Sequence, residues 1–306
     1  MKKKVLVIAG PTGVGKTACS IHMAKQLKGE IINGDAMQVY HGLDIGTAKI
    51  TEAETEHIPH HLLDCFTIYD DYNVKVFQAR GRELIEGISE KGLLPIVCGG
   101  TGLYIKSLLY DYVFQDEPKD YDFLEFLQSL SNSQLYALLS HVDQEALKTI
   151  HQNNRQRMIR AIEMAHSGMK KSEVIAAQQH ELLYDVFFIG LTMEREHLYE
   201  RINQRVDRMM DAGLFEEVKR LAEQEPAIWD MQCFQSIGYK EWRSHFEQGE
   251  STETCVNLIK KNSRNFAKRQ YTWFNNQLPM HWYDVQKQDW LQRALDDVNV
   301  WLSQES

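Results

Sequence analysis

Residues 10–17 read Gly10-Pro11-Thr12-Gly13-Val14-Gly15-Lys16-Thr17, and this stretch decides the fold. An apolar run at 5–9 precedes it, and a segment with apolar residues at helical spacing, 16–28, follows it. A glycine-rich turn between a buried strand and a helix, ending in Lys-Thr, is the pattern of a phosphate-binding loop. Its glycines let backbone N–H groups converge on phosphate oxygens at the positive end of the helix. We therefore predict that residues 10–17 bind a diphosphate or triphosphate, with Lys16 on the terminal phosphates and the Thr17 hydroxyl on Mg²⁺.

The chain around this loop alternates short apolar runs with helical patterns. Strands are predicted at residues 5–9, 30–33, 93–98 and 185–191, of which 5–9 is a continuous apolar run typical of a buried parallel strand. The helical patterns lie at residues 16–28, 74–90, 195–223 and 253–274. Gly29 is expected to stop the first helix. The alternation predicts an α/β fold, a P-loop doubly wound parallel sheet flanked by helices. Ligands of such sheets bind at the carboxyl ends of the strands, where Gly10, Asp35 and Gly99 fall.

The pattern changes after residue 112, because residues 116–181 carry successive helical patterns and no strand signal. The strand at 185–191 then returns to the sheet. We therefore expect a catalytic core made of residues 1–115 and 185–306, with an all-helical insertion domain at residues 116–184. This organisation is one α/β core interrupted by an insertion, and not two domains in series.

Composition and charge limit the class of protein. The chain has a formal net charge of −9, yet residues 148–171 and 260–269 are rich in Lys and Arg. Such runs are more often solvated helix faces than nucleic-acid sites, although a local basic face is what nucleic acid requires. The five cysteines are scattered without a C-x-x-C pair, which favours reduced thiols. No apolar stretch approaches the roughly 20 residues that cross a bilayer, so we expect a cytoplasmic protein outside the membrane.

The phosphate loop by itself leaves the reaction open. A motor or GTPase would carry an acidic residue at the end of an apolar strand, whereas the strand at 93–98 runs into Gly-Gly-Thr. A small-molecule kinase that uses ATP fits better, because Asp35 follows the second strand. At that position Asp35 faces the loop and is a candidate general base or an indirect Mg²⁺ ligand.

Further blocks of sequence carry a family resemblance. After the phosphate loop they are DAMQVY at 35–40, GLDIGTAK at 42–49, PHHLLD at 59–64, GGTGLY at 99–104, QRMIR at 156–160, RINQRVD at 201–207, IGYKE at 237–241 and AKRQYTW at 267–273. In this order they resemble the bacterial tRNA dimethylallyltransferases, also called tRNA isopentenyltransferases, over nearly the whole chain. The block GLDIGTAK is the most specific of them.

The resemblance implies a reaction. A dimethylallyl group would pass from dimethylallyl diphosphate to the exocyclic N6 amine of the adenosine just 3′ of the anticodon, in tRNAs that read codons beginning with U. The loop would then hold the diphosphate of the prenyl donor rather than ATP. An aromatic amine is a weak nucleophile, so orientation and stabilisation of the leaving charge should carry most of the acceleration. The target base must also leave its stack to reach a buried site.

The resemblance also implies roles for single residues. Lys16 and Arg205 would neutralise the departing diphosphate, Thr17 would bind Mg²⁺, Asp35 would accept a proton from the amine, and Thr101 would help to place the amine or the phosphates. The implied tRNA-binding positions are Asp35, Ala36, Met37, Gln38, Thr101, Gln156, Arg157, Met158, Ile159, Arg160, Gly238, Tyr239, Lys240, Lys268 and Arg269. Ala36 departs from the family pattern, which usually has Ser there, so the contact at this position stays open.

Two other functions remain open from the sequence: a P-loop kinase acting on a metabolite, and a relative that prenylates free adenine nucleotides. The insertion with Arg157 and Arg160 favours tRNA over a free nucleotide, since a small nucleotide needs no such platform. We expect a monomer whose partners are tRNA and dimethylallyl diphosphate. Trp273 and Phe274 are expected to pack in the core. The potential metal ligands His57, His60, His61 and Asp64 fall in a family block that accounts for them as structural or substrate-contacting residues.

Overall fold

The computed structural model describes residues 2–114, 120–177 and 181–304. The chain divides into two compact units, which are described separately below. Unit 1 consists of Met1–Tyr110 and Leu182–Ser306, and unit 2 is Asp111–Glu181. An isolated antiparallel bridge between Tyr110 and Leu182 lies where the chain leaves and re-enters unit 1.

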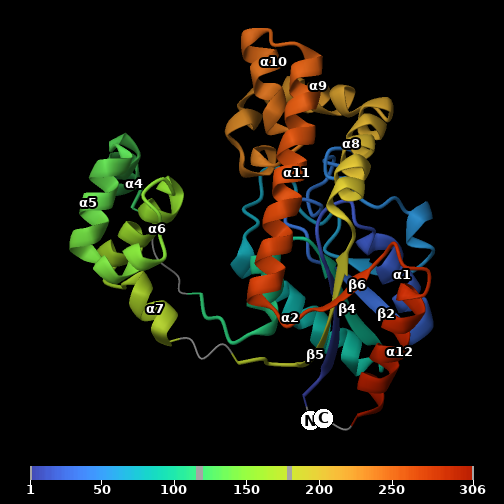
Figure 1. Ribbon diagram of the computed structural model, residues 1–306. Helices are drawn as coiled ribbons and strands as arrows, with labels where there is room; N and C mark the ends of the chain where they lie inside the picture. Colours follow the sequence, from blue (N-terminus) through green and yellow to red (C-terminus); the bar gives the residue numbers. More distant parts are fainter. Residues whose placement is uncertain (1, 115–119, 178–180, 305–306) are drawn as a thin grey trace. The chain divides into compact units, whose positions relative to one another are not determined.

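Unit 1 is built on a parallel six-stranded sheet with helices on both faces (Figure 1). Its strands, in the spatial order β3-β2-β4-β1-β5-β6, are β3 (His60–His61), β2 (Gly29–Asn33), β4 (Leu94–Gly99), β1 (Lys4–Ala9), β5 (Asp185–Thr192) and β6 (His281–Asp284). All neighbouring pairs are parallel. The predicted doubly wound α/β fold is confirmed. β1 and β2 are almost entirely buried because both faces of a parallel sheet are covered, which is why β1 is a continuous apolar run in the sequence.

Unit 1 contains eight α-helices and four 3₁₀ turns in its described part. They are α1 (Lys16–Leu27), α2 (Val74–Glu90), α3 (Gly102–Leu109), α8 (Arg195–Asp211), α9 (Leu214–Gln224), α10 (Arg243–Gln248), α11 (Thr252–Gln277) and α12 (Trp290–Ser303), with the 3₁₀ turns η1 (Ala53–Thr55), η3 (Pro226–Asp230), η4 (Gln232–Gln235) and η5 (Lys240–Trp242). Alternate residues of β1 face opposite cores. Val5 and Val7 belong to the core that includes Phe274 of α11, and Leu6 and Ile8 to the core that includes Trp301 of α12. Within the described residues, none of these helices has the length and apolarity needed to span a membrane.

One detail of the predicted elements is wrong. Gly29 does not stop the first helix: Lys28 closes α1 in the left-handed conformation, with φ 53°, and Gly29 is the first residue of β2. A Cβ atom at Gly29 would lie 2.7 Å from Leu94 O, so close strand packing requires glycine there. The helical pattern predicted at 195–223 is confirmed and consists of two helices, because Gly213 adopts a φ of 97° between α8 and α9.

Unit 2 is helical throughout its described part, as the sequence predicts. It consists of α4 (Tyr121–Ser129), α5 (Asn132–Val142), η2 (Gln144–Lys148), α6 (Arg155–His166) and α7 (Lys171–Ala177). Ser131 caps α5 in a reciprocal capping box with Gln134. The unit has its own core, in which Leu127, Leu139 and Met158 are fully buried. Unit 2 therefore has the features of a small folded domain inserted between α3 and β5.

Candidate active site

The phosphate-binding loop joins β1 to α1 at the carboxyl end of the sheet. Gly15, the residue before α1, has a φ of 109° and provides no side-chain cap. The first N–H groups of α1 therefore have no side-chain acceptor and point toward the loop, where an anion can accept their hydrogen bonds. Only glycine adopts this φ without strain, which explains its position in the motif. The loop and the start of α1 therefore offer open N–H groups to an anion, as the predicted phosphate-binding role requires.

Lys16 is the central cation of this loop. Its Nζ donates hydrogen bonds to Gly10 O at 3.1 Å and Pro11 O at 2.9 Å. The pKa of Lys16 is lowered to about 8. Burial is the main cause and the positive charge of Arg205 adds to it, while Cys98 and Asp35 act in the opposite direction. The ammonium is therefore mostly protonated near neutral pH but close to its titration range. A bound diphosphate would raise this pKa by supplying negative charge.

A second cation, Arg205, lies on α8, the helix that follows β5, and its side chain contacts the loop. Its Nη1 donates to Thr12 Oγ1 at 3.1 Å, and its Nη2 donates to Thr47 O at 3.4 Å. Burial lowers the pKa of Arg205, while the nearby carboxylate of Asp35 raises it. Since an arginine pKa starts above 12, the guanidinium stays charged at physiological pH. The structure thus brings together Lys16 and Arg205, as the sequence predicts for a site that neutralises phosphate.

Asp35 and Thr101 lie at the ends of the strands on the β4 side of the loop. Asp35 follows β2 and is half-buried, and its Oδ1 accepts a hydrogen bond from Met37 N at 2.9 Å. Thr101 Oγ1 accepts from Ala36 N at 3.3 Å, which ties the loop after β4 to the turn that carries Asp35. The pKa values of Lys16 and Arg205 are both raised by Asp35, so the carboxylate is within electrostatic reach of both cations. A carboxylate, a hydroxyl and two cations therefore share one end of the sheet.

The loop at 42–49 is held by a residue that the sequence reasoning missed. Glu217 of α9 is 6% exposed and accepts hydrogen bonds from three successive backbone amides, Asp44 N, Ile45 N and Gly46 N, at 3.0, 2.9 and 3.1 Å. Tyr239 Oη donates to the same carboxylate at 2.6 Å. In the sequence Glu217 looks like any other acid on an amphipathic helix, and only its buried position distinguishes it.

The predicted tRNA-binding positions in unit 1 fall into two groups. Lys240, Lys268 and Arg269 are exposed and available to a large ligand. Tyr239 is fully buried, and Gly238 is buried with its N–H on Glu241, so contacts through the Tyr239 side chain are not available in this structure. Around Asp35, Ala36 and Met37 are half-buried, and Gln38 Nε2 donates to Thr47 O at 3.1 Å.

The predicted tRNA-binding positions in unit 2 are divided between an exposed face and a buried face of α6. Gln156, Arg157 and Arg160 are exposed, whereas Met158 and Ile159 point into the unit's own core. Arg157 and Arg160 both lower the pKa of Lys171, after burial as the main cause, so the three positive side chains are neighbours. The basic face of unit 2 is therefore Arg157, Arg160 and Lys171, and the predicted contacts of Met158 and Ile159 are limited to their backbone atoms.

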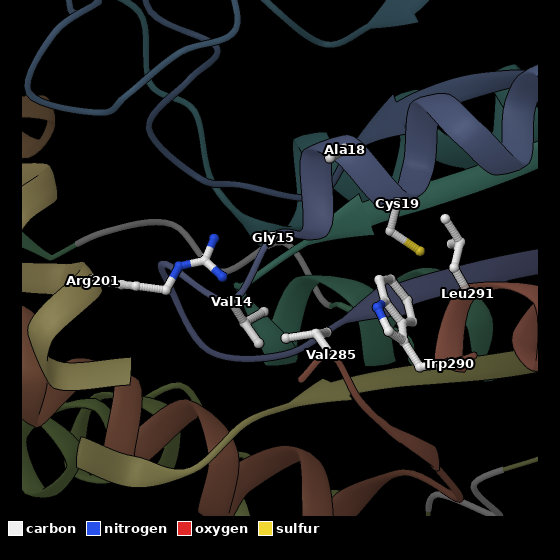
Figure 2. A pocket seen from close by; sticks show the side chains of 8 residues that line it. All are labelled: Val14, Gly15, Ala18, Cys19, Arg201, Val285, Trp290 and Leu291. Atoms are coloured by element: carbon white, nitrogen blue, oxygen red, sulfur yellow. The ribbon is translucent and has the colours of Figure 1, made fainter. Parts of the chain in front are cut away.

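A small cavity of about 220 Å³ lies on the other flank of the phosphate loop, toward β6. It is lined by Val14, Gly15, Ala18, Cys19, Arg201, Val285, Trp290 and Leu291. Figure 2 shows the guanidinium of Arg201 directed toward Gly15 from one side, with the Trp290 ring on the other. No local sequence pattern indicates this cavity, because its lining comes from three separate segments of the chain.

The remaining sequence candidates are two aromatic residues of α11 and a histidine-rich segment. Phe274 is fully buried and Trp273 packs on Gly102, where a Cβ atom would lie 2.1 Å from the indole, so their predicted core positions are confirmed. His61 pairs with Glu30 at 2.7 Å, and Asp64 pairs with Lys49 at 2.5 Å. Within the ranges that the structure describes, no group of three or more His, Cys, Asp or Glu side chains is placed to hold a metal ion.

These features fit a P-loop group-transfer enzyme: a loop with amides open to an anion, two half-buried cations and a carboxylate at the adjacent strand ends. The family described as IPP transferase matches residues 38–277, and the isopentenyl transferase family matches residues 3–71. A tRNA dimethylallyltransferase of Anoxybacillus flavithermus is 50% identical over 299 residues, which cover 97% of this chain and 96% of that relative. The chain belongs to the tRNA dimethylallyltransferase (IPP transferase) family.

Solved structures agree with this assignment. A tRNA delta(2)-isopentenylpyrophosphate transferase from Staphylococcus epidermidis is 42% identical, with a TM-score of 0.74 over 100% of both chains. A eukaryotic dimethylallyltransferase, described as acting on tRNA, is 32% identical, with a TM-score of 0.85 over 98% of this chain and 80% of that one. The likeness extends through both the core and the insertion.

Proposed function

We propose that this protein transfers the dimethylallyl group of dimethylallyl diphosphate to the N6 amine of the adenosine 3′-adjacent to the anticodon, in tRNAs that read codons beginning with U. The amine nitrogen bonds to C1 of the dimethylallyl group, the bond from C1 to the diphosphate oxygen breaks, and the amine loses one proton. The observation that carries the proposal is the close grouping of Lys16, Arg205 and Asp35 around a preformed anion loop in a chain of this family.

The leaving group is assigned to the loop and its two cations. Negative charge grows on the bridging oxygen as the bond to C1 breaks, and preorganised donors stabilise that charge without having to reorient. Lys16 already lies in the loop and exchanges its bonds to Gly10 O and Pro11 O for phosphate oxygens. Arg205 is held by Thr12 and Thr47, so its guanidinium is oriented before the donor binds.

The acceptor amine is assigned to the Asp35 and Thr101 side of the loop. The Asp35 carboxylate has one oxygen on Met37 N, which leaves the second oxygen to accept the amine proton. Thr101 Oγ1 is bonded to Ala36 N and keeps a donor hydrogen for the base or the phosphates. Ala36 takes part through its backbone amide, so the missing hydroxyl of the family's usual serine does not remove this contact.

A magnesium ion fits the loop if it binds together with the diphosphate of the substrate. Thr17 is exposed in the first turn of α1, and Mg²⁺ commonly takes one or two protein oxygens and completes its shell with phosphate oxygens and water. When bound, the ion supplies positive charge to the diphosphate. Thr17 is the residue we assign to hold it.

The decisive experiment incubates the purified protein with dimethylallyl diphosphate, labelled in the allyl group, and unmodified tRNA. We expect label in tRNA at the adenosine 3′ of the anticodon, and diphosphate as the other product. ATP with a labelled γ-phosphate and a mixture of metabolites serves as the kinase arm. Transfer of γ-phosphate without allyl transfer contradicts the proposal, and label in free AMP but never in tRNA favours the adenylate-prenylating alternative.

The depressed pKa of Lys16 predicts a pH dependence of donor binding. Below the Lys16 pKa of about 8 the ammonium is charged and attracts diphosphate, and as pH rises through this value the charge and the attraction are lost. The dissociation constant of the donor should rise by up to about tenfold per pH unit above that pKa, since one proton is taken up on binding. Calorimetry at alkaline pH, where the donor is fully ionised, measures this. Lys16→Met should bind weakly with a flat profile, and an equally steep profile in Lys16→Met contradicts the assignment.

The basic face of unit 2 predicts a salt-dependent effect on tRNA binding. Arg157→Ala should weaken tRNA binding about tenfold and reduce the slope of log affinity against log salt by about 1, because one phosphate contact is lost. Donor affinity should not change. Arg243→Ala is the matched control, since this exposed arginine is already paired with Asp230 and Glu247. An unchanged salt slope in Arg157→Ala contradicts the assignment of this face to tRNA.

A further inference from the structure

One buried side chain joins the two halves of the active site, and the proposed function gives it no role so far. Gln270 of α11 is 6% exposed, although the residues just before it, Lys268 and Arg269, and the residue just after it, Tyr271, are exposed. A buried primary amide is normally retained only where both its oxygen and its nitrogen are hydrogen-bonded. Gln270 meets this condition, and its partners lie on two different loops.

The amide oxygen binds the phosphate loop. Gln270 Oε1 accepts a hydrogen bond from Thr12 N at 2.8 Å. The hydroxyl of the same threonine accepts from Arg205 Nη1 at 3.1 Å, so Thr12 is held from both sides by side chains. The position of Gln270 is therefore coupled to the part of the site that holds the diphosphate.

The amide nitrogen binds the loop after β4. Gln270 Nε2 donates to Gly100 O at 2.9 Å, and it lies so close to this residue that a Cβ atom at Gly100 would be 2.3 Å from Nε2. The next residue is Thr101, whose Oγ1 accepts from Ala36 N beside Asp35. On this side Gln270 is coupled to the part of the site that receives the amine.

Backbone pairing in the sheet does not by itself link the phosphate loop to the loop after β4. The register between β1 and β4 stops at Ala9 and Gly99, just before the residues that contact substrate. On the other side of β4, backbone bonds continue the connection, because Thr101 N donates to Gly34 O at 3.3 Å. Between the phosphate loop and the loop after β4, the link is made by the Gln270 amide, which is bonded to Thr12 N and to Gly100 O.

We propose that Gln270 is a positioning residue that sets the distance between the diphosphate-binding loop and the acceptor side of the site at Thr101 and Asp35. This inference rests on the proposed prenyl transfer. Gln270 acts through Thr12 and Gly100 and touches neither substrate in this assignment. Its loss leaves each half able to bind its own substrate and changes only the alignment of the amine with C1.

Gln270→Met keeps the length of the side chain and removes both hydrogen bonds. We expect the turnover number for transfer to tRNA to fall about 10²-fold, the effect of an alignment error of about 1 Å. The dissociation constants of dimethylallyl diphosphate and of tRNA should stay within about two-fold of the unaltered protein, since uniform binding is not affected. Gln277→Met, which removes an exposed amide from the same helix, is the matched control and should not change turnover.

A second variant reaches the same bridge from its other end and serves if Gln270→Met does not fold. In Gly100→Ala the new methyl group displaces the amide nitrogen, so turnover should fall to a similar extent. In the double variant Gly100→Ala/Gln270→Ala the clash is absent and the bridge is already broken. Its turnover should match that of Gln270→Ala alone, whereas independent effects would multiply.

Amide exchange provides a readout that does not depend on activity. The Thr12 amide bonds to Gln270, so hydrogen exchange at Thr12 should accelerate in Gln270→Met and not in Gln277→Met. Unchanged turnover in Gln270→Met, or a loss of substrate affinity in parallel with turnover, overturns the positioning role. The proposed function still stands in that case, provided that the unaltered protein transfers the dimethylallyl group to tRNA. Absence of transfer by the unaltered protein overturns the proposed function itself, and the positioning role with it.

Discussion

Asp35→Asn is expected to lower the turnover number for prenyl transfer by about 10²- to 10⁴-fold, the range of a lost general base. Asparagine keeps an oxygen that can accept from Met37 N, as Asp35 Oδ1 does at 2.9 Å, so the turn after β2 should be preserved. It cannot take up the proton that the amine releases. Single-turnover measurements with both substrates bound isolate this step from binding and product release.

The control for Asp35→Asn is Glu83→Gln, which neutralises an exposed carboxylate on α2. It should leave the turnover number unchanged. Asp35→Asn should also keep tRNA affinity within about three-fold, because the lost interaction belongs to the chemical step. If tRNA affinity and turnover fall by the same factor, Asp35 positions the base and does not accept its proton.

Arg205→Met is expected to lower kcat/KM for dimethylallyl diphosphate by about 10²- to 10³-fold, as removal of one preorganised charge donor does elsewhere. Arg205 is half-buried and bonds to Thr12 and Thr47, so the variant removes a fixed charge and leaves methylene packing in place. Steady-state rates at varied donor concentration measure the effect. Thermal unfolding should shift little, since methionine fills most of the same volume.

The matched control for Arg205→Met is Arg208→Met, which removes an exposed arginine from the same helix, α8. It should change donor kinetics by less than about two-fold, because exposed charges are screened by water and salt. Equal losses in the two variants would mean that the general positive field of α8 matters, and not the placement of Arg205 against the loop.

The buried network around Glu217 and Gln270 illustrates what a sequence does not display. Both residues lie in helices whose patterns place polar side chains on a solvated face, and both are 6% exposed in the folded chain. Their partners are backbone amides and carbonyls of loops far away in the sequence. Hydrogen bonds of this kind follow from which loops the fold brings together, so local periodicity cannot reveal them. The same reasoning explains Tyr239, whose motif suggested RNA contact but whose side chain is buried.

The short strands were missed for a related reason. β3 is His60–His61 and β6 is His281–Asp284, too short for any alternation to emerge from the sequence. They exist because β2 and β5 offer parallel edges with unpaired backbone groups. The longer strands β1, β4 and β5 were predictable because both of their faces are buried, which requires a continuous apolar run.

The sequence by itself determined the phosphate loop, the parallel α/β core, the helical insertion and the family. Each depends on local patterns: glycines that permit a left-handed turn, apolar runs for buried strands, helical periodicity, and residue blocks in a family order. Only the tertiary structure decided which side chains meet around the loop. Lys16, Arg205, Asp35 and Gln270 come from separate elements, and burial changes their chemistry, lowering the pKa of Lys16 to about 8 and isolating the Gln270 amide from water. Both the lowered pKa and the burial depend on residues that are close in space but far apart in the sequence, so local sequence patterns do not reveal them.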